Sequence, residues 1–367
     1  MMNDAPSPNR HSRGKFDTVQ ALRFLAAFMV VWVHSTFYTH ERLDASTAIF
    51  ALGANGVRLF FVISGFVMVV SSQRLIGAAR RAQVFAMKRI LRIVPLYWLV
   101  TSVKLVALLA APAVVLHAKV DWGYVIRSYL FIPAVNVDGE IKPLLGVGWT
   151  LNFEMFFYAL FALALLIRIR PLLLIAPVLV LLSGLSLLHA PDWPPELLFW
   201  SDPIILDFLA GMVLAGWVGQ GKALPVPVAA LSALAGLGWL FVPWLHPIVP
   251  GLVGSLLTTL AAGVVVAGAV ALEPVLGPRM PRFALFMGAA SYSLYLVHPL
   301  VAPASPHVLG RLGIHTPVLA VILSILVAMV AGALCYLLVE MPISRITDGW
   351  AKRREFFTLR QIPAEQS

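Results

Sequence analysis

The amino-acid sequence predicts an all-α polytopic membrane protein with about ten transmembrane helices, both termini in the cytoplasm and no soluble domain. Of the 367 residues, 60% are hydrophobic and only 12% are charged, about half the charged fraction of a soluble domain. The mean hydropathy is +0.88. Apolar runs recur that approach the ~20 residues a helix needs to cross a bilayer, and basic residues gather in alternate connections between them.

Ten segments are apolar and long enough to be candidate spans, with boundaries accurate to a few residues. In chain order they cover residues 19–38, 51–71, 93–112, 148–167, 171–189, 203–219, 226–245, 251–271, 284–302 and 317–340. We therefore expect a cytoplasmic segment over 1–18, a ten-helix membrane domain over 19–340 and a basic cytoplasmic tail over 341–367. No small-residue cleavage site follows the first apolar run, so no cleaved signal peptide is expected.

The distribution of basic residues predicts the topology. They concentrate in one alternating set of connections, at residues 10–15, 74–92, 168–170, 222, 279–282 and 345–360. The positive-inside rule places this set, and with it both termini, in the cytoplasm. The net charge of +10 therefore reflects topology and contact with lipid headgroups, and we expect no nucleic-acid partner. The single cysteine, Cys335, excludes a disulfide framework and a cysteine-based metal cluster.

Arg23 and His34 lie in the first apolar segment, eleven residues apart. This spacing places both on nearly the same helical face, about 16 Å apart along the axis. Ionisable residues within a span are costly, so two on one stripe indicate a lined pathway. The alternative is that Arg23 extends to the interface and His34 closes the far end of the helix.

Four other polar residues are expected at the same outer level as His34. Glu154, His298, Arg58 and Asp207 come from four different candidate spans. A histidine beside a carboxylate is a common general-base arrangement, so the group predicts a polar site. The alternative is a hydrogen-bonded cluster that only holds helices together.

On the cytoplasmic side, Arg89 and Arg92 share a helical face and have the geometry to grip a phosphate. Basic residues beside spans also serve topology alone. The sequence has no Walker loop, dinucleotide fingerprint, HExxH motif or GxSxG elbow, so an ATP-driven pump or a zinc protease is unsupported. The longest connection, residues 113–147, is expected outside, either as an interfacial amphipathic helix or as part of a site.

Four motifs together resemble the acyltransferase-3 family of bacterial membrane proteins, especially members that O-acetylate exopolysaccharides without an appended domain. They are QALRFLAA at 20–27 leading to His34, GVRLFFVISGF at 56–66, RILR at 89–92 with Pro95 and Tyr97, and WTLNFE at 149–154 with SYSLYLVH at 291–298. Family members carry aspartate or arginine at the position of Arg58. The resemblance implies a ten-span core with both termini inside, in agreement with the topology above.

The resemblance implies transfer of an acyl group, usually acetyl, from cytoplasmic acyl-CoA to a sugar hydroxyl of a surface or lipid-linked glycan, across the bacterial inner membrane. Acyl-CoA is then the donor, bound by Arg23, Arg89 and Arg92, and no metal is expected. His34 is expected as the base or as an acyl carrier, with Glu154 orienting it. Sugar-site candidates are Arg58, Trp149, Tyr158 and His298. A proton-coupled transporter and a glycan-binding scaffold are the alternatives.

Overall fold

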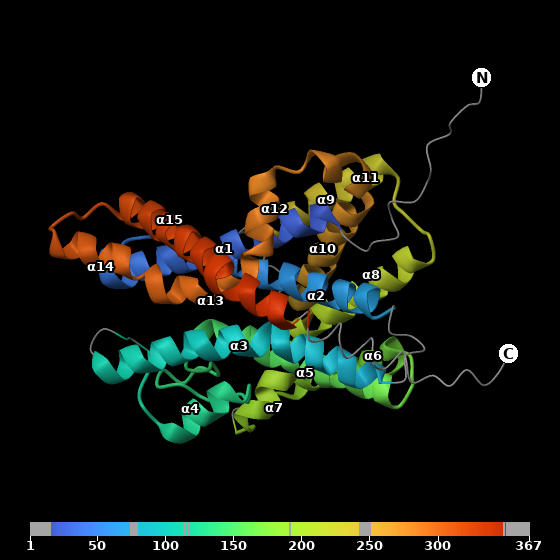
Figure 1. Ribbon diagram of the computed structural model, residues 1–367, viewed down its shortest axis with the longest axis horizontal. Helices are drawn as coiled ribbons and strands as arrows, with labels where there is room; N and C mark the ends of the chain where they lie inside the picture. The colour runs from blue at the N-terminus through green and yellow to red at the C-terminus, as the bar shows by residue number, and fades with distance from the viewer. Residues whose placement is uncertain are drawn as a thin grey trace.

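The computed structural model describes residues 16–73, 80–112, 115, 117–190, 192–241, 251–347 and 349, and this part is mostly helical (Figure 1). Its only β pairing is an isolated antiparallel bridge between Val135 and Ile141. Most of the expected terminal segments 1–18 and 341–367, and the end of the expected span 226–245, lie outside the described residues.

Seven helical segments of the described residues are long and apolar enough to cross a membrane. They contain α1 Asp17–Arg42, α2 Gly56–Ser72, α3 Arg81–Ala110, α5 Trp149–Leu166, α6 Pro171–Leu185, α10 Gly251–Ala271 and α15 Pro317–Cys335. A short 3-10 turn precedes α2, and a π-helical turn, Tyr336–Glu340, continues α15. The helical membrane class predicted from the sequence is confirmed.

The three other expected spans take a different form. α8 Leu206–Gly219 and α9 Val226–Phe241 are apolar but short. The ninth is broken into α12 Arg282–Ala289 and α13 Ser291–Val301, which with α14 Ala304–Arg311 form a pair bent by 72°. The described residues therefore contain seven spans, or eight if the bent pair counts as one, and a count of ten stays a prediction.

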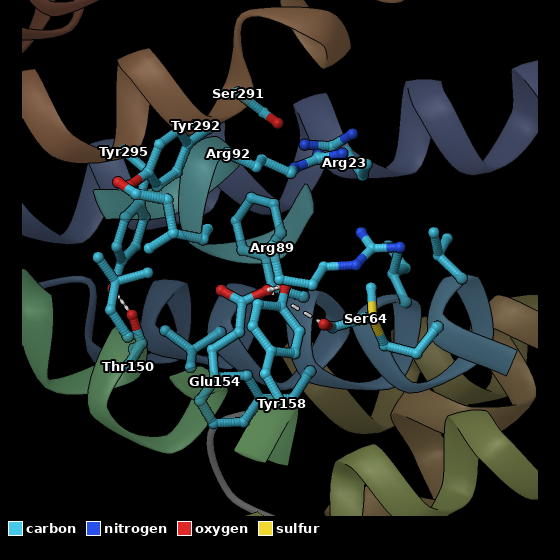
Figure 2. Close-up of a pocket in the computed structure, with 18 residues that line it drawn as sticks. Arg23, Ser64, Arg89, Arg92, Thr150, Glu154, Tyr158, Ser291, Tyr292 and Tyr295 are labelled. Atoms are coloured by element: carbon cyan, nitrogen blue, oxygen red, sulfur yellow. Dashed lines mark hydrogen bonds between the residues drawn. The ribbon is translucent and has the colours of Figure 1, made fainter. Parts of the chain in front are cut away.

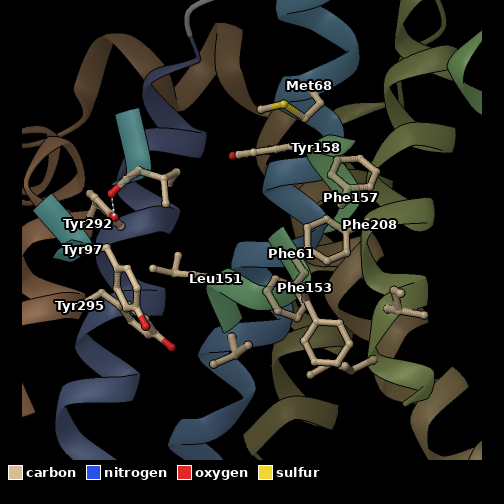
Figure 3. Close-up of a cluster of buried hydrophobic side chains, with 14 of the residues drawn as sticks. Phe61, Met68, Tyr97, Leu151, Phe153, Phe157, Tyr158, Phe208, Tyr292 and Tyr295 are labelled. Carbon is tan, nitrogen blue, oxygen red and sulfur yellow. Dashed lines mark hydrogen bonds between the residues drawn. The ribbon is translucent and has the colours of Figure 1, made fainter. Parts of the chain in front are cut away.

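Helix α2 lies between two groups of helices (Figure 1). One face of α2, including Val57 and Phe61, joins a core built with α3, α5, α8 and α13. Another face, including Val62 and Phe66, joins a core built with α1, α8, α9 and α10. Aromatic stacking is prominent in the first core, where the Phe61 and Phe208 rings are 4.4 Å apart (Figure 3). Because α2 belongs to both cores, it fixes the two groups relative to each other.

Two glycines allow α2 and α8 to touch along their backbones. A Cβ atom added at Gly65 would lie 2.1 Å from the carbonyl oxygen of Phe208, and one added at Gly211 would lie 2.0 Å from that of Val62. Membrane helices lack a hydrophobic driving force for association, so small residues at such contacts supply close van der Waals packing. This contact holds α2, and the site residues on it, against α8.

The N-terminus of α1 is fixed by a side chain from a distant part of the chain. Glu273, in the short helix α11 Glu273–Leu276, accepts hydrogen bonds from the backbone N–H groups of Asp17 at 3.0 Å and Thr18 at 2.8 Å. The hydroxyl of Thr18 also donates to Glu273. A carboxylate at this end of a helix satisfies unpaired N–H groups and complements the helix dipole. The capped first turn lies just before Arg23.

The long connection between α3 and α5 folds back over the bundle. It contains α4 Trp122–Tyr129, which Asp121 caps by accepting from the N–H of Tyr124. His117 ties this connection to α1, since its Nε2 lies 2.6 Å from Glu41 and its Nδ1 lies 2.7 Å from Asp138. The expected amphipathic helix is present, with Trp122 and Ile126 exposed.

We predict that Gly211→Ala destabilises the protein by about 1–3 kcal/mol, because the added methyl group forces α2 and α8 apart. Gly216→Ala is the matched control on the same helix, since no atom lies within 4 Å of its added Cβ and alanine favours helix formation. Thermal unfolding in detergent measures both. Equal melting temperatures for the two variants would contradict the close α2–α8 contact.

We also predict that the contacts of His117 with Glu41 and Asp138 weaken as pH rises. Partial burial lowers the pKa of His117, but hydrogen bonds and charges from Glu41 and Asp138 outweigh it, and the net pKa is raised. Because the folded-state pKa exceeds the unfolded value, the stabilisation is complete below about pH 6.5 and is lost as pH rises through the folded-state pKa.

Hydrogen exchange of residues 130–144, corrected for the intrinsic effect of pH, should therefore increase above pH 6.5. His117→Gln keeps a polar side chain but cannot gain charge, so its exchange should be fast at every pH. A wild-type exchange rate that, after this correction, does not change with pH would contradict the stabilisation by His117.

Candidate functional site

A cavity opens where α1, α2, α3, α5 and α13 converge (Figure 2). It contains about 820 Å³ of empty space, including open solvent at its mouth. Polar side chains from all five helices line it: Arg23, Ser64, Arg89, Arg92, Thr150, Glu154, Tyr158, Ser291, Tyr292 and Tyr295. One cavity thus brings together five of the nine residues expected at a site: Arg23, Arg89, Arg92, Glu154 and Tyr158.

Glu154 and Tyr158 line the part of the cavity that is lowest in Figure 2. They are four residues apart on α5, which places them on one helical face, and the hydroxyl of Tyr158 donates to Glu154. Ser64 of α2 donates to the same carboxylate oxygen at 3.1 Å. The carboxylate therefore has two hydroxyl partners inside the bundle. The expected pairing of Glu154 with His34 is not among these contacts.

Arg89 is held in place by neighbours. Its Nη2 donates to the hydroxyl of Ser71 at 2.8 Å. Its guanidinium carbon lies 5.4 Å from the ring centre of Phe85 and 5.9 Å from that of Tyr158, within the range of cation–π attraction. Arg89 therefore supports Tyr158, and through it Glu154, in addition to lining the cavity.

Arg23 and Arg92 differ from Arg89 in having no such anchors. In the part of the chain that the structure describes, neither forms a hydrogen bond or a salt bridge. Their like charges act on each other, with Glu340 the nearest compensating charge for Arg23. Arg92 is also exposed, whereas Arg23 is partly buried. Two guanidinium groups with free donors in one cavity form an anion-binding environment.

His34 and His298 lie together, outside the cavity lining. Nδ1 of His298 donates to the carbonyl oxygen of Leu294 at 3.1 Å, which leaves its Nε2 as an acceptor. Nδ1 of His34 lies 2.9 Å from the carbonyl oxygen of Val30 and 3.2 Å from that Nε2, so it carries a proton shared between the two. The hydrogen-bond partners therefore assign the proton to Nδ1 in both histidines. The lone pair on Nε2 of His34 is therefore available to accept a proton.

Tyr295 connects the cavity with the histidine pair. Its side chain lines the cavity, and its ring centre lies 6.0 Å from that of His298. Its hydroxyl donates to the carbonyl oxygen of Val147 at 2.9 Å and lies 2.9 Å from the hydroxyl of Thr150. The polar lining therefore continues from the guanidinium groups of Arg23 and Arg92 toward the imidazoles.

Arg58 has a different environment from the one expected of a sugar ligand. Its Nη1 lies 3.4 Å from Oδ1 of the fully buried Asp207, and its Nη2 donates to the hydroxyl of Ser255 at 2.9 Å. Thr259 donates to the same oxygen of Asp207 at 2.6 Å. This ion pair joins α2, α8 and α10 away from the cavity lining. For Arg58 and Asp207 the geometry agrees with the alternative given above, a hydrogen-bonded cluster that holds helices together.

Trp149 also lies outside the cavity lining. It packs edge-to-face with Phe153, with ring centres 5.9 Å apart, and with Phe61, with ring centres 6.4 Å apart.

The residues expected at one outer level are divided among three places: the cavity, the histidine pair and the Arg58–Asp207 pair. Hydropathy gives the depth of a residue in a span, but it does not give the rotation of the helix that separates these groups.

Several cavity residues were not singled out from the sequence. Ser64, Thr150 and Ser291 are hydroxyl groups in the lining, and all three belong to the motifs quoted above. Glu340 is near Arg23 and Arg92, and it accepts from the backbone N–H of Ser293 at 3.2 Å. The sequence signal for Glu340 is weak, because a glutamate at the end of the last apolar run is also expected at an interface.

Among the described residues no group of three or more His, Cys, Asp or Glu side chains could hold a metal ion. The arrangement offers guanidinium donors at one end, hydroxyl groups and a carboxylate along the wall, and an imidazole lone pair beyond Tyr295. These groups can bind an anion and remove a proton from a hydroxyl at separate positions.

Comparison with known proteins agrees with these features. The acyltransferase-3 family model, described as an acyltransferase domain, matches residues 16–338. The "Exopolysaccharide production protein ExoZ" of Rhizobium meliloti (strain 1021) is 33% identical over 321 residues, or 83% of this chain and 95% of that relative. "Nodulation protein 10" of Rhizobium leguminosarum bv. viciae is 30% identical over 168 residues, or 41% of this chain and 44% of that relative. No solved structure matches significantly. The chain therefore belongs to the acyltransferase-3 family of membrane acyltransferases.

Proposed function

We propose that this protein is a membrane O-acyltransferase that moves an acetyl group from cytoplasmic acetyl-CoA to a sugar hydroxyl of an exopolysaccharide or its lipid-linked precursor. The observation that carries the proposal is the cavity itself, with unpaired guanidinium groups at one end and a polar wall that leads to the His34–His298 pair. The name of the Rhizobium meliloti relative supports an exopolysaccharide as the acceptor.

Coenzyme A is anionic through its phosphates, so we assign it to the end of the cavity that contains Arg23 and Arg92. By the positive-inside rule we assign this end to the cytoplasmic face of the bacterial inner membrane, where the donor is made. Arg23 and His34 are about 16 Å apart along α1. An extended pantetheine arm is of comparable length, so it would carry the thioester toward His34.

In the chemical step we propose, Nε2 of His34 takes the proton from the acceptor hydroxyl. The hydroxyl oxygen attacks the thioester carbonyl, the C–S bond breaks, and the departing thiolate receives the proton from the His34 imidazolium. His298 holds the Nδ1 proton of His34 through the 3.2 Å contact and so keeps Nε2 free. Transfer through an acyl group carried on Nε2 uses the same atom, with attack in two steps.

The remaining expected site residues receive other roles. We assign Glu154 and Tyr158 to the cavity wall along the pantetheine arm, because Glu154 bonds with Ser64 and Tyr158. We assign Arg58 and Trp149 to the fold, since Arg58 bonds with Asp207 and Trp149 packs against aromatic rings.

The direct test is incubation of purified protein with acetyl-CoA labelled in the acetyl group and with exopolysaccharide from a strain that lacks the gene. Labelled polysaccharide and free CoA are expected in equal amounts. A transporter or a glycan-binding scaffold would leave the thioester intact and the polysaccharide unlabelled.

We predict that His34→Ala reduces acetyl transfer by at least about 100-fold, since general-base catalysis contributes typically 10²–10⁴-fold. His40→Ala is the matched control on the same helix, because His40 bonds with the carbonyl oxygen of Thr47 and does not line the cavity, so it should keep near wild-type activity. Transfer is measured at equal amounts of folded, membrane-inserted protein. Full transfer by His34→Ala would remove His34 from the mechanism.

We predict that lysine substitutions separate Arg92 from Arg89. Arg92→Lys keeps the charge but loses the forked donor, so acetyl-CoA affinity should fall about tenfold, equivalent to about 1.4 kcal/mol. Arg89→Lys should change affinity less than about twofold, because Arg89 already bonds with Ser71 and lies over Tyr158.

Calorimetric titration of the detergent-purified variants measures these affinities. Arg81→Lys is the control, since Arg81 donates to the carbonyl oxygen of Leu165 and does not line the cavity. Equal losses for Arg89→Lys and Arg92→Lys would contradict the different roles, and no loss for Arg92→Lys would remove it from the donor site.

A further inference from the structure

The break between α12 and α13 places a helix N-terminus in the wall of the cavity. α13 begins at Ser291, and Ser291, Tyr292 and Tyr295 of this helix all line the cavity. The first N–H groups of a helix have no partner within the helix, and its dipole favours negative charge at this end. A continuous helix through this region would have these N–H groups paired.

The hydroxyl of Ser291 is the second, independent observation. Ser291 is fully buried, and its Oγ has no hydrogen-bond partner among the described residues. A buried hydroxyl without a partner destabilises the folded protein. Figure 2 shows the Ser291 oxygen directed to the same part of the cavity as Arg23 and Arg92. An occupant of the cavity with acceptor oxygens would satisfy it.

The charges around Ser291 select the occupant. Arg23 and Arg92 bring two positive charges without salt bridges in the described part of the chain. Of the carboxylates that act on Arg23, Glu340 is committed to the backbone N–H and the hydroxyl of Ser293, at 3.2 and 2.5 Å, and Glu154 to the hydroxyls of Ser64 and Tyr158. Glu340 therefore fills the neighbouring position of the α13 N-terminus and leaves Ser291 free for a separate anion.

We propose that Ser291 and the first turn of α13 complete a phosphate-binding site with Arg23 and Arg92, and that this site holds a phosphate group of the acyl donor. The inference rests on the proposed function, because it takes the donor to be an acyl-CoA. Three sets of donors surround one anion: two guanidinium forks, a hydroxyl, and helix N–H groups. We place Arg89 outside this site, because its Nη2 bonds with Ser71 and its guanidinium group lies over the rings of Phe85 and Tyr158.

The site requires a phosphate and makes no use of the acyl group, so ligands with and without phosphate test it. We would measure binding of acetyl-CoA and of S-acetyl-pantetheine, which has no phosphate, to wild type and Ser291→Ala in phosphatidylcholine nanodiscs. Ser291→Ala should weaken acetyl-CoA binding about tenfold, as expected for one lost hydrogen bond to a charged group. The affinity for S-acetyl-pantetheine should stay unchanged.

Ser324→Ala controls for the loss of a buried hydroxyl, since Ser324 is fully buried and donates to the carbonyl oxygen of Ala302 outside the cavity lining. It should bind both ligands as wild type does. Unchanged acetyl-CoA binding by Ser291→Ala would overturn the proposal, as would an equal loss for both ligands.

An anionic lipid headgroup is the other source of phosphate. A second set of nanodiscs that contain phosphatidylglycerol separates the two sources, since phosphatidylcholine carries no net charge. If Ser291→Ala changes acetyl-CoA binding only when phosphatidylglycerol is present, the site belongs to a lipid and the donor assignment is wrong. All titrations are made without acceptor glycan. If acetyl transfer is absent but phosphate-dependent binding is normal, the proposed function is contradicted and this site is not. If transfer is normal but Ser291→Ala binds acetyl-CoA as wild type does, this site is contradicted and the proposed function is not.

Discussion

The cost of placing charge in hydrocarbon is the constraint on which the arrangement of this protein depends. Most charged side chains within the helices have a partner: Arg58 pairs with Asp207, Arg89 with Ser71, and Glu154 with Ser64 and Tyr158. Each pair also joins two or more helices, so polar contacts contribute to the packing that α2 organises with its glycine contact to α8. Arg23 and Arg92 form no such pair among the described residues, and both line the cavity between the helices.

The same constraint separates the guanidinium groups from the imidazoles along α1. Arg23 lies about 16 Å from His34 on this helix, and Glu273 fixes the first turn of the helix with two backbone hydrogen bonds. His34 is oriented by Val30 and His298, and no charged group bonds with it in the described structure. A neutral imidazole is suited to accept a proton from a hydroxyl, whereas guanidinium groups are suited to hold a permanent anion.

Some of this could be predicted from the sequence. The spacing of Arg23 and His34, the Arg89–Arg92 pair and the similar depths of Arg58 and Asp207 all follow from helical periodicity and hydropathy. The rotation of each helix does not, and it separates Glu154 from His34 and places Arg58 on Asp207. The break at Ala290 was also missed, because residues 284–302 are mainly apolar and contain no proline before Pro299. The break lies beside a close tertiary contact, in which Gly288 approaches the backbone of Gln20.

The central claim is that one polar route connects a donor site on one side of the membrane with a base near the other side. The most direct measurement uses proteoliposomes in which the protein has a single orientation, with labelled acetyl-CoA outside and acceptor glycan sealed inside. Label should appear on the enclosed glycan when the cytoplasmic face is outside, and only then. Label on glycan that is supplied on the same side as acetyl-CoA, with none on the enclosed glycan, would contradict transfer through the bundle.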